Sequence, residues 1–418
     1  MANSRSQQVW LSGEAIGRIT SRSRTSVAFE YNNDVLERYP LNTPLLSCSL
    51  PTRRGKNNAR AFFAGLLPEG DHRRFLAEQA GCLSSDVFAL LETFGRDVAG
   101  AVWIGDEPPS ATSHSSAQPG NATYSRDALE NEVAGLDSRP LAIYDDSALS
   151  IAGIQNKMLL VQQPDGSWAR PIAGYPSTHI LKVDDRRHAG LVRAEDTCLA
   201  IARAAGIPAA NSRIEILAGI DCIIVERFDR RVDGERVSRV HQEDACQALG
   251  VDLEGKDLRA KYEANGGPSL RNVAALLNGY SQESQVELLR LLEQLVFTVA
   301  IGNADHHAKN ISFLHTDARH ITLAPLYDTI PTGLWATLDS RAAMSIGAAV
   351  DIPDIDSRDL IREAHAWGLP EPIARDHLRD TLERLQESSH RIPKSGQLDV
   401  TSWVQRNLTR LLASLQRT

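Results

Sequence analysis

The sequence predicts an α+β chain, with sheet in its first part and mainly helix in its last part. At 418 residues the chain is longer than one hydrophobic core usually covers, so about two or three folding units are expected. Up to about residue 240, short apolar runs alternate with turn residues, which is typical of strands. After His241 the apolar positions recur at helical spacing, which favours helices.

The composition is that of a globular protein and gives no sign of nucleic-acid binding. The hydrophobic fraction of 42% and the charged fraction of 23% argue against a fibrous or wholly disordered chain. The net charge of -8 lacks the basic excess that drives direct binding to DNA. Two local basic clusters are interpreted as solvated surface. They comprise Arg53, Arg54 and Lys56, and Arg227, Arg230 and Arg231.

The cysteines and the apolar segments indicate a cytoplasmic protein. The cysteines are scattered and odd in number, and they form neither a CxxC nor a Cys/His zinc pattern, so reduced thiols are expected. They are Cys48, Cys82, Cys198, Cys222 and Cys246. The first residues, MANSRSQQVW, do not read as a signal peptide, and no segment is long and apolar enough to span a membrane. No membrane partner is therefore expected.

The chain divides into four segments on composition and periodicity. Residues 1–106 are predicted to form a small α+β unit, with a helical segment near 58–80. Residues 107–135 are expected to be a flexible linker or loop, since 107–123 are rich in Pro, Ser, Thr and Gly. Residues 136–240 are predicted to form a sheet lobe and residues 241–418 a helical lobe.

Helical spacing marks one helix inside the sheet lobe and three near the C-terminus. AEDTCLAIARAAGIP, residues 194–208, has amphipathic spacing and stops at Gly206 and Pro208. The C-terminal segments lie at about 358–367, 370–387 and 400–416.

The segment GNADHHAKNISF, residues 302–313, carries the sharpest chemical pattern. Asp305 and Asn310 are five positions apart, the spacing by which a kinase catalytic loop holds a base and a metal-binding amide. An isolated Asp and Asn in a turn is also a common local capping device. The pattern gains weight from ITLAPLYDTIP downstream, whose Asp328 stands where a second magnesium-ligating carboxylate belongs. Asp328 is otherwise read as a cap or turn residue.

Lys182 lies in the apolar run THILKV, where an unpaired ammonium group would be costly to bury. It therefore requires an anionic partner, either phosphate oxygens or a carboxylate such as Glu195 at the start of the following helix. The alternative is a strand lysine that extends to water at the edge of a sheet.

Two further segments fit around a nucleotide. Residues 150–157, SIAGIQNK, join two strand-like stretches and could offer backbone donors to phosphates, although one glycine makes neither a Walker A loop nor a GxGxxG pattern. Glu226, Arg227 and Phe228 end a strand before the helical region, where a cleft between lobes would receive adenine. The order of parts is loop, lysine, helix glutamate, hinge, Asp/Asn loop and second Asp, which is the order of a kinase.

The adjacent His306 and His307 suggest a metal site, but adjacent histidines rarely bind one ion without further ligands at matching spacing. A role in shaping the loop is preferred. A metal-dependent hydrolase using both histidines and Asp328 stays open as an alternative.

These residues together carry a family resemblance. The segments SIAGIQNKMLL, THILKV, VERFDRR, HQEDACQALG, IGNADHHAKN and APLYD resemble successive signatures of HipA, the kinase toxin of bacterial HipBA toxin–antitoxin systems. LLSCSLP and FFAGLLPEGDHRR are similar to the N-terminal subdomain of that family. The resemblance implies a two-lobed protein-kinase-like fold with N-terminal mixed α/β subdomains and a mainly helical C-terminal lobe.

The resemblance also implies roles for individual residues. Asp305 would be the catalytic base, Asn310 and Asp328 would hold Mg²⁺, and Ser150 matches the autophosphorylated serine of the family. The residues implied to contact ATP are Ala152, Gly153, Ile154, Gln155, Asn156, Lys157, Lys182, Glu195, Glu226, Arg227, Phe228, His307, Ala308, Lys309, Asn310, Tyr327 and Asp328.

The implied function is a serine/threonine protein kinase toxin that uses ATP and Mg²⁺. Its implied partners are a HipB-like helix-turn-helix antitoxin, operator DNA reached through that antitoxin, and a protein substrate such as glutamyl-tRNA synthetase or another aminoacyl-tRNA synthetase. A phosphate on Ser150 would add about two negative charges beside the nucleotide and switch the kinase off. The alternative is a catalytically silent, kinase-shaped co-repressor.

Overall fold

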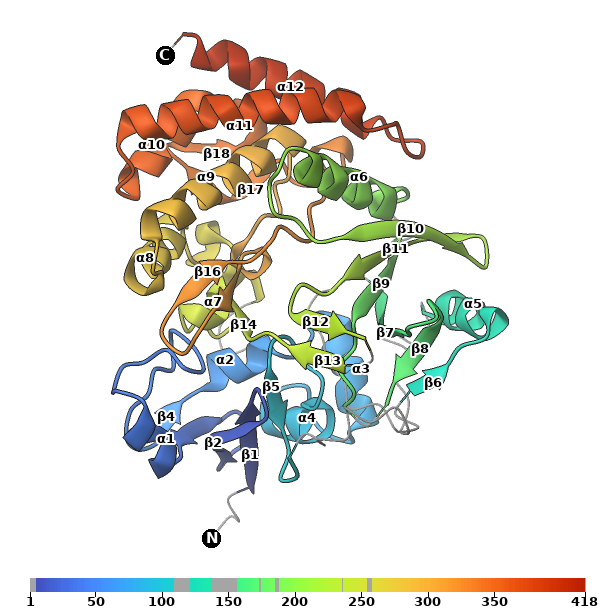
Figure 1. Cartoon of the computed structure of the whole chain (residues 1–418), viewed down its shortest axis with the longest axis vertical. Coiled ribbons are helices and arrows are strands. Elements are labelled where there is room, and N and C mark those ends of the chain that lie inside the picture. Colours follow the sequence, from blue (N-terminus) through green and yellow to red (C-terminus); the bar gives the residue numbers. More distant parts are fainter. Residues whose placement is uncertain are drawn as a thin grey trace.

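The computed structural model describes residues 5–108, 121–136, 156–172, 174–184, 188–234, 236–253 and 258–417. In Figure 1 the first hundred residues lie at the bottom, the strands of the middle segment lie at the right, and the C-terminal helices lie at the top. This arrangement confirms the predicted α+β class and the mainly helical C-terminal part. Within these ranges, no helix combines the length and the apolar character that crossing a bilayer requires.

The N-terminal domain is an antiparallel sheet of strand order β4-β3-β2-β1-β5 covered by short helices. Its strands are β1 (Arg5–Leu11), β2 (Glu14–Ser21), β3 (Ala28–Tyr31), β4 (Asn57–Asn58) and β5 (Val102–Ile104). Its helices are α1 (Asn33–Arg38), α2 (Arg60–Gly65), α3 (Gly70–Gln79) and α4 (Val87–Phe94). The helical segment predicted near 58–80 is thus two helices, because Pro68 lies between them and a proline cannot continue a helix.

The second sheet has the order β10-β11-β9-β7-β8-β6. Its strands are β6 (Asn121–Thr123), β7 (Lys157–Gln162), β8 (Trp168–Pro171), β9 (His179–Val183), β10 (Ser212–Leu217) and β11 (Ile220–Glu226). The helix α6 (Leu191–Ala204) covers one face, as the amphipathic spacing predicted. A short hairpin, β12 (Arg230–Asp233) and β13 (Arg236–Arg239), follows.

Part of the expected linker is ordered structure. Within 107–135, β6 pairs antiparallel with β8, and α5 (Arg126–Gly135) buries Leu129 and Val133 in the core of this sheet. Residues 121–135 therefore differ from the flexible loop that their neighbours' composition predicted. Three polar or small residues form β6, so its strand conformation comes from pairing with β8 rather than from propensity.

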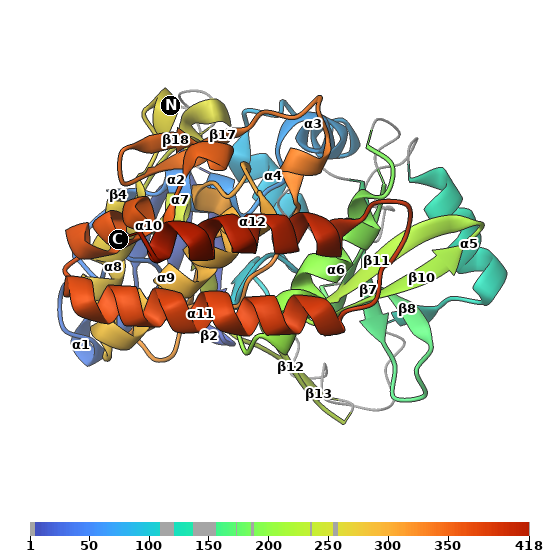
Figure 2. The same ribbon diagram turned by 90° about the horizontal axis from the view of Figure 1, so that it is seen from above.

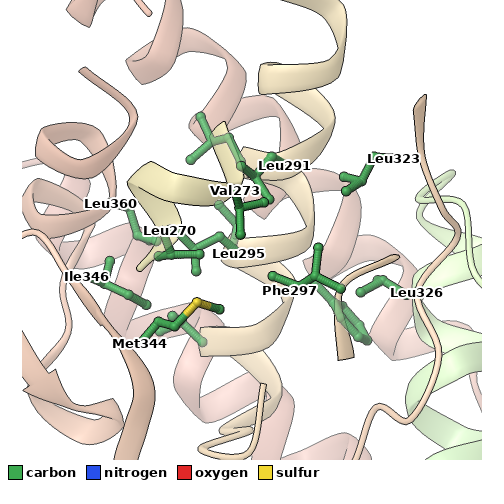
Figure 3. Close-up of a cluster of buried hydrophobic side chains, with 14 of the residues drawn as sticks. Leu270, Val273, Leu291, Leu295, Phe297, Leu323, Leu326, Met344, Ile346 and Leu360 are labelled. Carbon is green, nitrogen blue, oxygen red and sulfur yellow. The ribbon is translucent and has the colours of Figure 1, made fainter. Parts of the chain in front are cut away.

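The C-terminal lobe is built around α9 (Ser284–Ile301), which is buried on most of its surface from Leu288 to its end. Figure 3 shows its Leu291, Leu295 and Phe297 among apolar side chains of the surrounding elements. The other helices are α7 (Ala245–Ala248), α8 (Leu270–Tyr280), α10 (Ser357–Ala366), α11 (Glu371–Arg391) and α12 (Val400–Leu415). Figure 2 shows α11 and α12 lying side by side, and the last three helices confirm the three predicted C-terminal segments.

Short strands also occur in this lobe, where the helical periodicity did not predict them. They are β14 (Gln242–Asp244), β15 (Ser312–His315), β16 (Ile321–Leu323), β17 (Arg341–Ile346) and β18 (Ala349–Asp351). The loop that carries Asp305 leads into β15 at Ser312, and β17 contacts it through a hydrogen bond from the N–H of Ala343 to the carbonyl of Ala304 at 2.9 Å.

The HQED stretch attaches the N-terminal domain to the rest of the chain. His241 donates a hydrogen bond from Nε2 to the carbonyl of Leu46, at 2.8 Å. The buried carboxylate of Glu243 accepts hydrogen bonds from Ser47 Oγ at 2.5 Å and from the backbone N–H of Cys48 at 2.9 Å. Glu243 also contacts His315 Nε2 at 3.0 Å. Removing this carboxylate would therefore leave buried donors of two domains unpaired.

The five cysteines, all within the described residues, carry no disulfide, as their scatter predicted. Four of them are buried, and burial raises the pKa of each of these thiols. They pack as small apolar side chains.

Candidate functional site

A cleft of about 1290 Å³ opens where the N-terminal domain, the second sheet and the C-terminal lobe meet. Most of the predicted site residues line it, although they come from distant parts of the chain. Those residues are Asn156, Lys157, Lys182, Glu195, Glu226, Arg227, Phe228, Asp305, His307, Lys309, Asn310, Tyr327 and Asp328. Ala308 is fully buried and does not line the cleft. Ser150, Ala152, Gly153, Ile154 and Gln155 lie outside the described residues.

Lys182 joins the two halves of the cleft. Its Nζ lies 2.8 Å from Glu195 Oε1 on α6 and 2.7 Å from Asp328 Oδ1. Burial alone would lower the pKa of Lys182, but the two carboxylates outweigh it and raise that pKa. The lysine is therefore a cation at this position, and it is held between the sheet side and the C-terminal side of the cleft.

Glu195 and Asp328 differ in their surroundings. The Glu195 side chain is 1% exposed, and burial raises the pKa of its carboxyl group. Asp328 is 35% exposed at its side chain, and Lys182 overcomes the effect of burial and lowers the pKa of Asp328. Glu195 can therefore orient Lys182 from its buried position on α6, while Asp328 stays ionised at the cleft surface.

Asp328 has an unusual backbone conformation. Its φ of 54° lies in the left-handed region, which few residues other than glycine, asparagine and aspartate adopt. The two preceding residues are anchored, since Leu326 pairs with Ala209 and Tyr327 Oη hydrogen-bonds to Ser312 Oγ at 2.6 Å. Strain of this kind persists where the surroundings determine the conformation, and it is frequent at functional sites.

The loop of Asp305 begins where α9 ends. Gly302 has φ 76°, and a Cβ atom there would lie 2.9 Å from Trp403 Nε1, so the position favours glycine. Two α12 side chains satisfy the last carbonyls of α9: Trp403 donates to Ile301 at 2.8 Å, and Asn407 donates to Ala300 at 3.0 Å. The end of the helix, and hence the start of the loop, is fixed by the C-terminal helix.

Within the loop, Asp305 and Asn310 are directly connected. Asn310 Nδ2 donates to the backbone carbonyl of Asp305 at 3.0 Å, and the backbone N–H of Asp305 donates to Asn303 Oδ1 at 2.9 Å. The Asp305 side chain remains 50% exposed in the cleft. Partial burial in the cleft raises the pKa of Asp305, and a hydrogen bond from Tyr262 acts in the opposite direction.

Asn310 of this loop and Asp328 together offer oxygen atoms that fit a magnesium ion. Because Nδ2 of Asn310 is bound to the backbone, its Oδ1 is the atom left to act as a ligand, and Asp328 adds an ionised carboxylate. Magnesium prefers oxygen ligands and retains waters, so these two side chains and phosphate oxygens would suffice.

The two histidines do not share a site. His307 lines the cleft and His306 does not. Burial lowers the pKa of His306 to about 4 and that of His307 to about 3, so both are neutral at pH 7. Among the residues that the structure describes, no three His, Cys, Asp or Glu side chains form a metal-binding group. The geometry therefore favours the loop-shaping role over a histidine metal site.

The hinge residues have different environments. Glu226 ends β11, and Phe228 packs against Tyr327 with ring centroids 5.4 Å apart, so both face the cleft. The guanidinium of Arg227 is instead buried and donates to both carboxylate oxygens of Asp229 at 2.9 and 2.8 Å. Arg227 therefore lies in the wall of the cleft, and its charge is paired with that of Asp229.

Arg227 and Asp229 belong to a buried ionic cluster, defined here as Asp97, Arg227, Asp229, Arg230 and Arg239. The interpretation of Arg227 and Arg230 as solvated surface is therefore wrong, because both are buried and paired with carboxylates. Asp97 of the N-terminal domain lies 2.9 Å from Arg230 Nη2 and 3.5 Å from Arg239 Nη2. Burial favours the neutral carboxyl, yet the arginines outweigh it and hold the pKa of Asp97 below its usual range. The cluster fastens the hinge to the N-terminal domain.

Lys157 and Lys309 are the other two basic residues among the predicted ones. Lys157 stands opposite Lys182 on the neighbouring strand, and burial lowers its pKa to about 7 with Lys182 adding to the effect. The Lys309 ammonium lies 3.3 Å from Glu69 Oε1 and 3.4 Å from Asp244 Oδ2. Lys309 is therefore paired with carboxylates of the protein.

The sequence did not predict every polar residue of the cleft; among those it missed are Glu69, Asp244, Lys261 and Tyr262. The HQED motif was a signal for Asp244, whose side chain caps α7. Glu69 lies in the segment FFAGLLPEGDHRR, which carries the resemblance of the N-terminal part, but nothing in that segment indicates that this carboxylate reaches the cleft through the packing of the N-terminal domain.

The chain matches known families over most of its length. The "HipA N-terminal domain" family matches residues 7–105, and the "HipA-like C-terminal domain" family matches residues 149–389. A Sinorhizobium fredii protein named "Putative kinase Y4mE" is 34% identical over 392 residues, which cover 92% of this chain and 91% of that protein. The "Serine/threonine-protein kinase toxin HipA" of Shewanella oneidensis is 30% identical over 380 residues, covering 86% and 84% of the two chains.

A solved structure agrees with these matches. A chain of the Shewanella oneidensis toxin–antitoxin complex of HipA, HipB and operator DNA superposes with a TM-score of 0.79 at 26% identity. The superposition covers 98% of this chain and 97% of the other. On these matches and on its fold, the chain belongs to the HipA family.

Proposed function

We propose that this chain is an ATP-dependent serine/threonine protein kinase that acts as the toxin of a toxin–antitoxin pair. The observation that carries the proposal is the convergence of Lys182, Glu195 and Asp328 with Asp305 and Asn310 in one cleft. This set supplies a phosphate-binding cation, a base and oxygen ligands, which are the parts that phosphoryl transfer requires.

Each residue has a proposed task. Lys182, oriented by Glu195, binds phosphate oxygens of ATP. Asp305 accepts the proton of a Ser or Thr hydroxyl as that oxygen attacks the γ-phosphorus in line with the departing ADP oxygen. Asn310 and Asp328 would hold Mg²⁺, and the ion would neutralise charge on the phosphates.

The hinge and the upstream loop complete the proposed nucleotide site. Glu226 and Phe228 stand where adenine would enter, with Tyr327 packed against Phe228. Lys157 begins β7 beside the cleft, and Asn156 directly precedes it. For the preceding residues, which include the proposed autophosphorylation site Ser150, the proposal rests on the family resemblance alone.

The Shewanella oneidensis match supports the proposed partners. Its structure was solved with HipB and operator DNA. By analogy, this chain would bind a HipB-like antitoxin in the cytoplasm and reach DNA through it. Its substrate would be an aminoacyl-tRNA synthetase such as glutamyl-tRNA synthetase.

Affinity capture from the native cell should recover a small helix-turn-helix protein as the main partner. Recovery of no such protein would contradict the proposed antitoxin partner.

The proposal is tested by mass spectrometry of the chain and of cell-extract proteins after incubation with ATP and Mg²⁺. Phosphoserine or phosphothreonine is expected, and chelation of the metal with EDTA should abolish it. Nucleotide binding without any transfer to the chain or to extract proteins would instead indicate the silent co-repressor.

Proton uptake on nucleotide binding is a further expected result. Because burial lowers the pKa of Lys157 to about 7, a bound polyanion should raise that pKa and draw a proton from the buffer at pH 7 to 8. Calorimetric titrations in buffers of different ionisation enthalpy should therefore give different heats. Replacing Lys157 by Met should remove most of that difference; an unchanged difference would contradict the assignment.

A further inference from the structure

The carboxylate of Asp305 is held by a tyrosine. Tyr262 Oη donates a hydrogen bond to Asp305 Oδ1 at 2.6 Å. The Tyr262 ring also forms a T-shaped contact with His307 in the loop of Asp305, with ring centroids 5.2 Å apart at 82°. Since the Asp305 side chain is otherwise half exposed, this bond restricts which way its second oxygen faces.

The segment that carries Tyr262 is itself rigid. It consists of two 3-10 turns, Leu258–Lys261 and Glu263–Asn265. Glu263 Oε2 accepts hydrogen bonds from both the N–H and the hydroxyl of Ser345 on β17, each at 2.7 Å. The return of the chain is tight, because a Cβ at Gly267 would lie 2.3 Å from the Ala260 carbonyl oxygen. Tyr262 is therefore presented on a fixed support.

The support is connected to the N-terminal domain through Glu69. Lys261 Nζ lies 3.1 Å from Glu69 Oε2 and 5.7 Å from the centroid of the Tyr262 ring. The other oxygen of Glu69 pairs with Lys309, four residues after Asp305. Burial would raise the pKa of Glu69, but Lys309 and Lys261 outweigh it and lower that pKa to about 2, so this carboxylate is ionised. The carboxylate of Glu69 thus forms ion pairs with both the segment of Tyr262 and the loop of Asp305.

We propose that Tyr262 and Glu69 are positioning residues for Asp305, so that the N-terminal domain is part of the phosphoryl-transfer machinery. The inference rests on the proposed kinase function. Tyr262 fixes the base directly, and Glu69 fixes Tyr262 through Lys261 and the loop through Lys309. Neither residue is assigned any contact with the reacting atoms.

The test measures transfer of ³²P from labelled ATP, to the chain itself and to cell-extract protein, over a range of ATP concentrations. Tyr262→Phe should lower the maximal rate about tenfold while the half-saturating ATP concentration stays within about twofold, because positioning affects the transition state rather than nucleotide binding. Tyr280→Phe removes a hydroxyl from a half-buried tyrosine outside the cleft and should leave both quantities unchanged.

A double variant separates positioning from general loosening of the structure. Glu69→Gln should also lower the maximal rate about tenfold, and Tyr262→Phe combined with Glu69→Gln should be no more than about threefold slower than the slower single variant, since both act through one carboxylate. If the two single losses of maximal rate multiply in the double variant, Tyr262 and Glu69 do not act through the same carboxylate, and the proposal is overturned. Should the Glu69→Gln chain fail to fold, Tyr262→Phe decides, because it retains the ring and its packing.

The outcomes distinguish this inference from the proposed function. A wild-type chain that transfers no phosphate refutes both. An active wild-type chain whose Asp305→Asn variant is inactive, but whose Tyr262→Phe variant has the wild-type maximal rate, refutes the positioning role alone. An altered half-saturating ATP concentration with an unchanged maximal rate would overturn it as well, by making Tyr262 a nucleotide-binding residue.

Discussion

Replacing Asp305 by Asn should reduce phosphoryl transfer by about a thousandfold, the effect of removing a general base from an otherwise intact site. The amide has the shape of the carboxylate but cannot accept the proton of the attacking hydroxyl. Nucleotide affinity should change little, because the proposed phosphate ligand Lys182 and the proposed metal ligands Asn310 and Asp328 are untouched. Transfer is measured with radiolabelled ATP, and affinity is measured by calorimetry with a non-hydrolysable analogue.

The matched control for this experiment is Asp317→Asn. Asp317 lies on the surface with its side chain 54% exposed, so its replacement should leave transfer unchanged. An Asp305→Asn chain that labels itself or an extract protein at more than about one tenth of the wild-type rate would contradict the role of this residue as base.

Replacing Asp97 by Ala should destabilise the chain by about 3–5 kcal/mol, the usual cost of leaving buried charges without their partner. Asp97 is fully buried, accepts a hydrogen bond from the backbone N–H of Ser177 at 3.0 Å, and pairs with Arg230 at 2.9 Å. Without it the buried ionic cluster keeps three arginines against one aspartate. The change is measured by thermal or urea unfolding.

An exposed ion pair supplies the control. Asp106 contacts Arg18 at 3.1 Å with its side chain 60% exposed, and pairs of this kind contribute less than about 1 kcal/mol. Asp106→Ala should therefore unfold close to the wild-type midpoint. Equal midpoints for Asp97→Ala and Asp106→Ala would show that the buried cluster does not stabilise the fold.

The sequence predicted the centre of the site better than its borders. Lys182, Glu195, Asp305, Asn310 and Asp328 could be selected because each is a charged or amide side chain on a recognisable strand, helix or loop, and these elements follow one another in a fixed order. Their convergence follows from the fold. The structure brings all five to one cleft, although the roles assigned to them stay predictions until variants are measured.

The borders depend on packing between domains, which periodicity does not report. Glu69 and Asp97 are distant in sequence from the residues they pair with, and neither belongs to a pattern that predicts a partner. Likewise, three-residue strands such as β6 and β14 are too short to show an alternation of apolar and polar residues. Their conformation is imposed by neighbouring strands.

The attachment of Trp403 and Asn407 to the end of α9 makes the far C-terminus a vulnerable part of the molecule. A cellular protease that trimmed the chain back past residue 400 would free the carbonyls of Ala300 and Ile301 and uncover Gly302, without touching the cleft. Cleavage there would loosen the segment leading to Asp305, so loss of α12, which is nearly one hundred residues away in sequence, would abolish the proposed phosphoryl transfer.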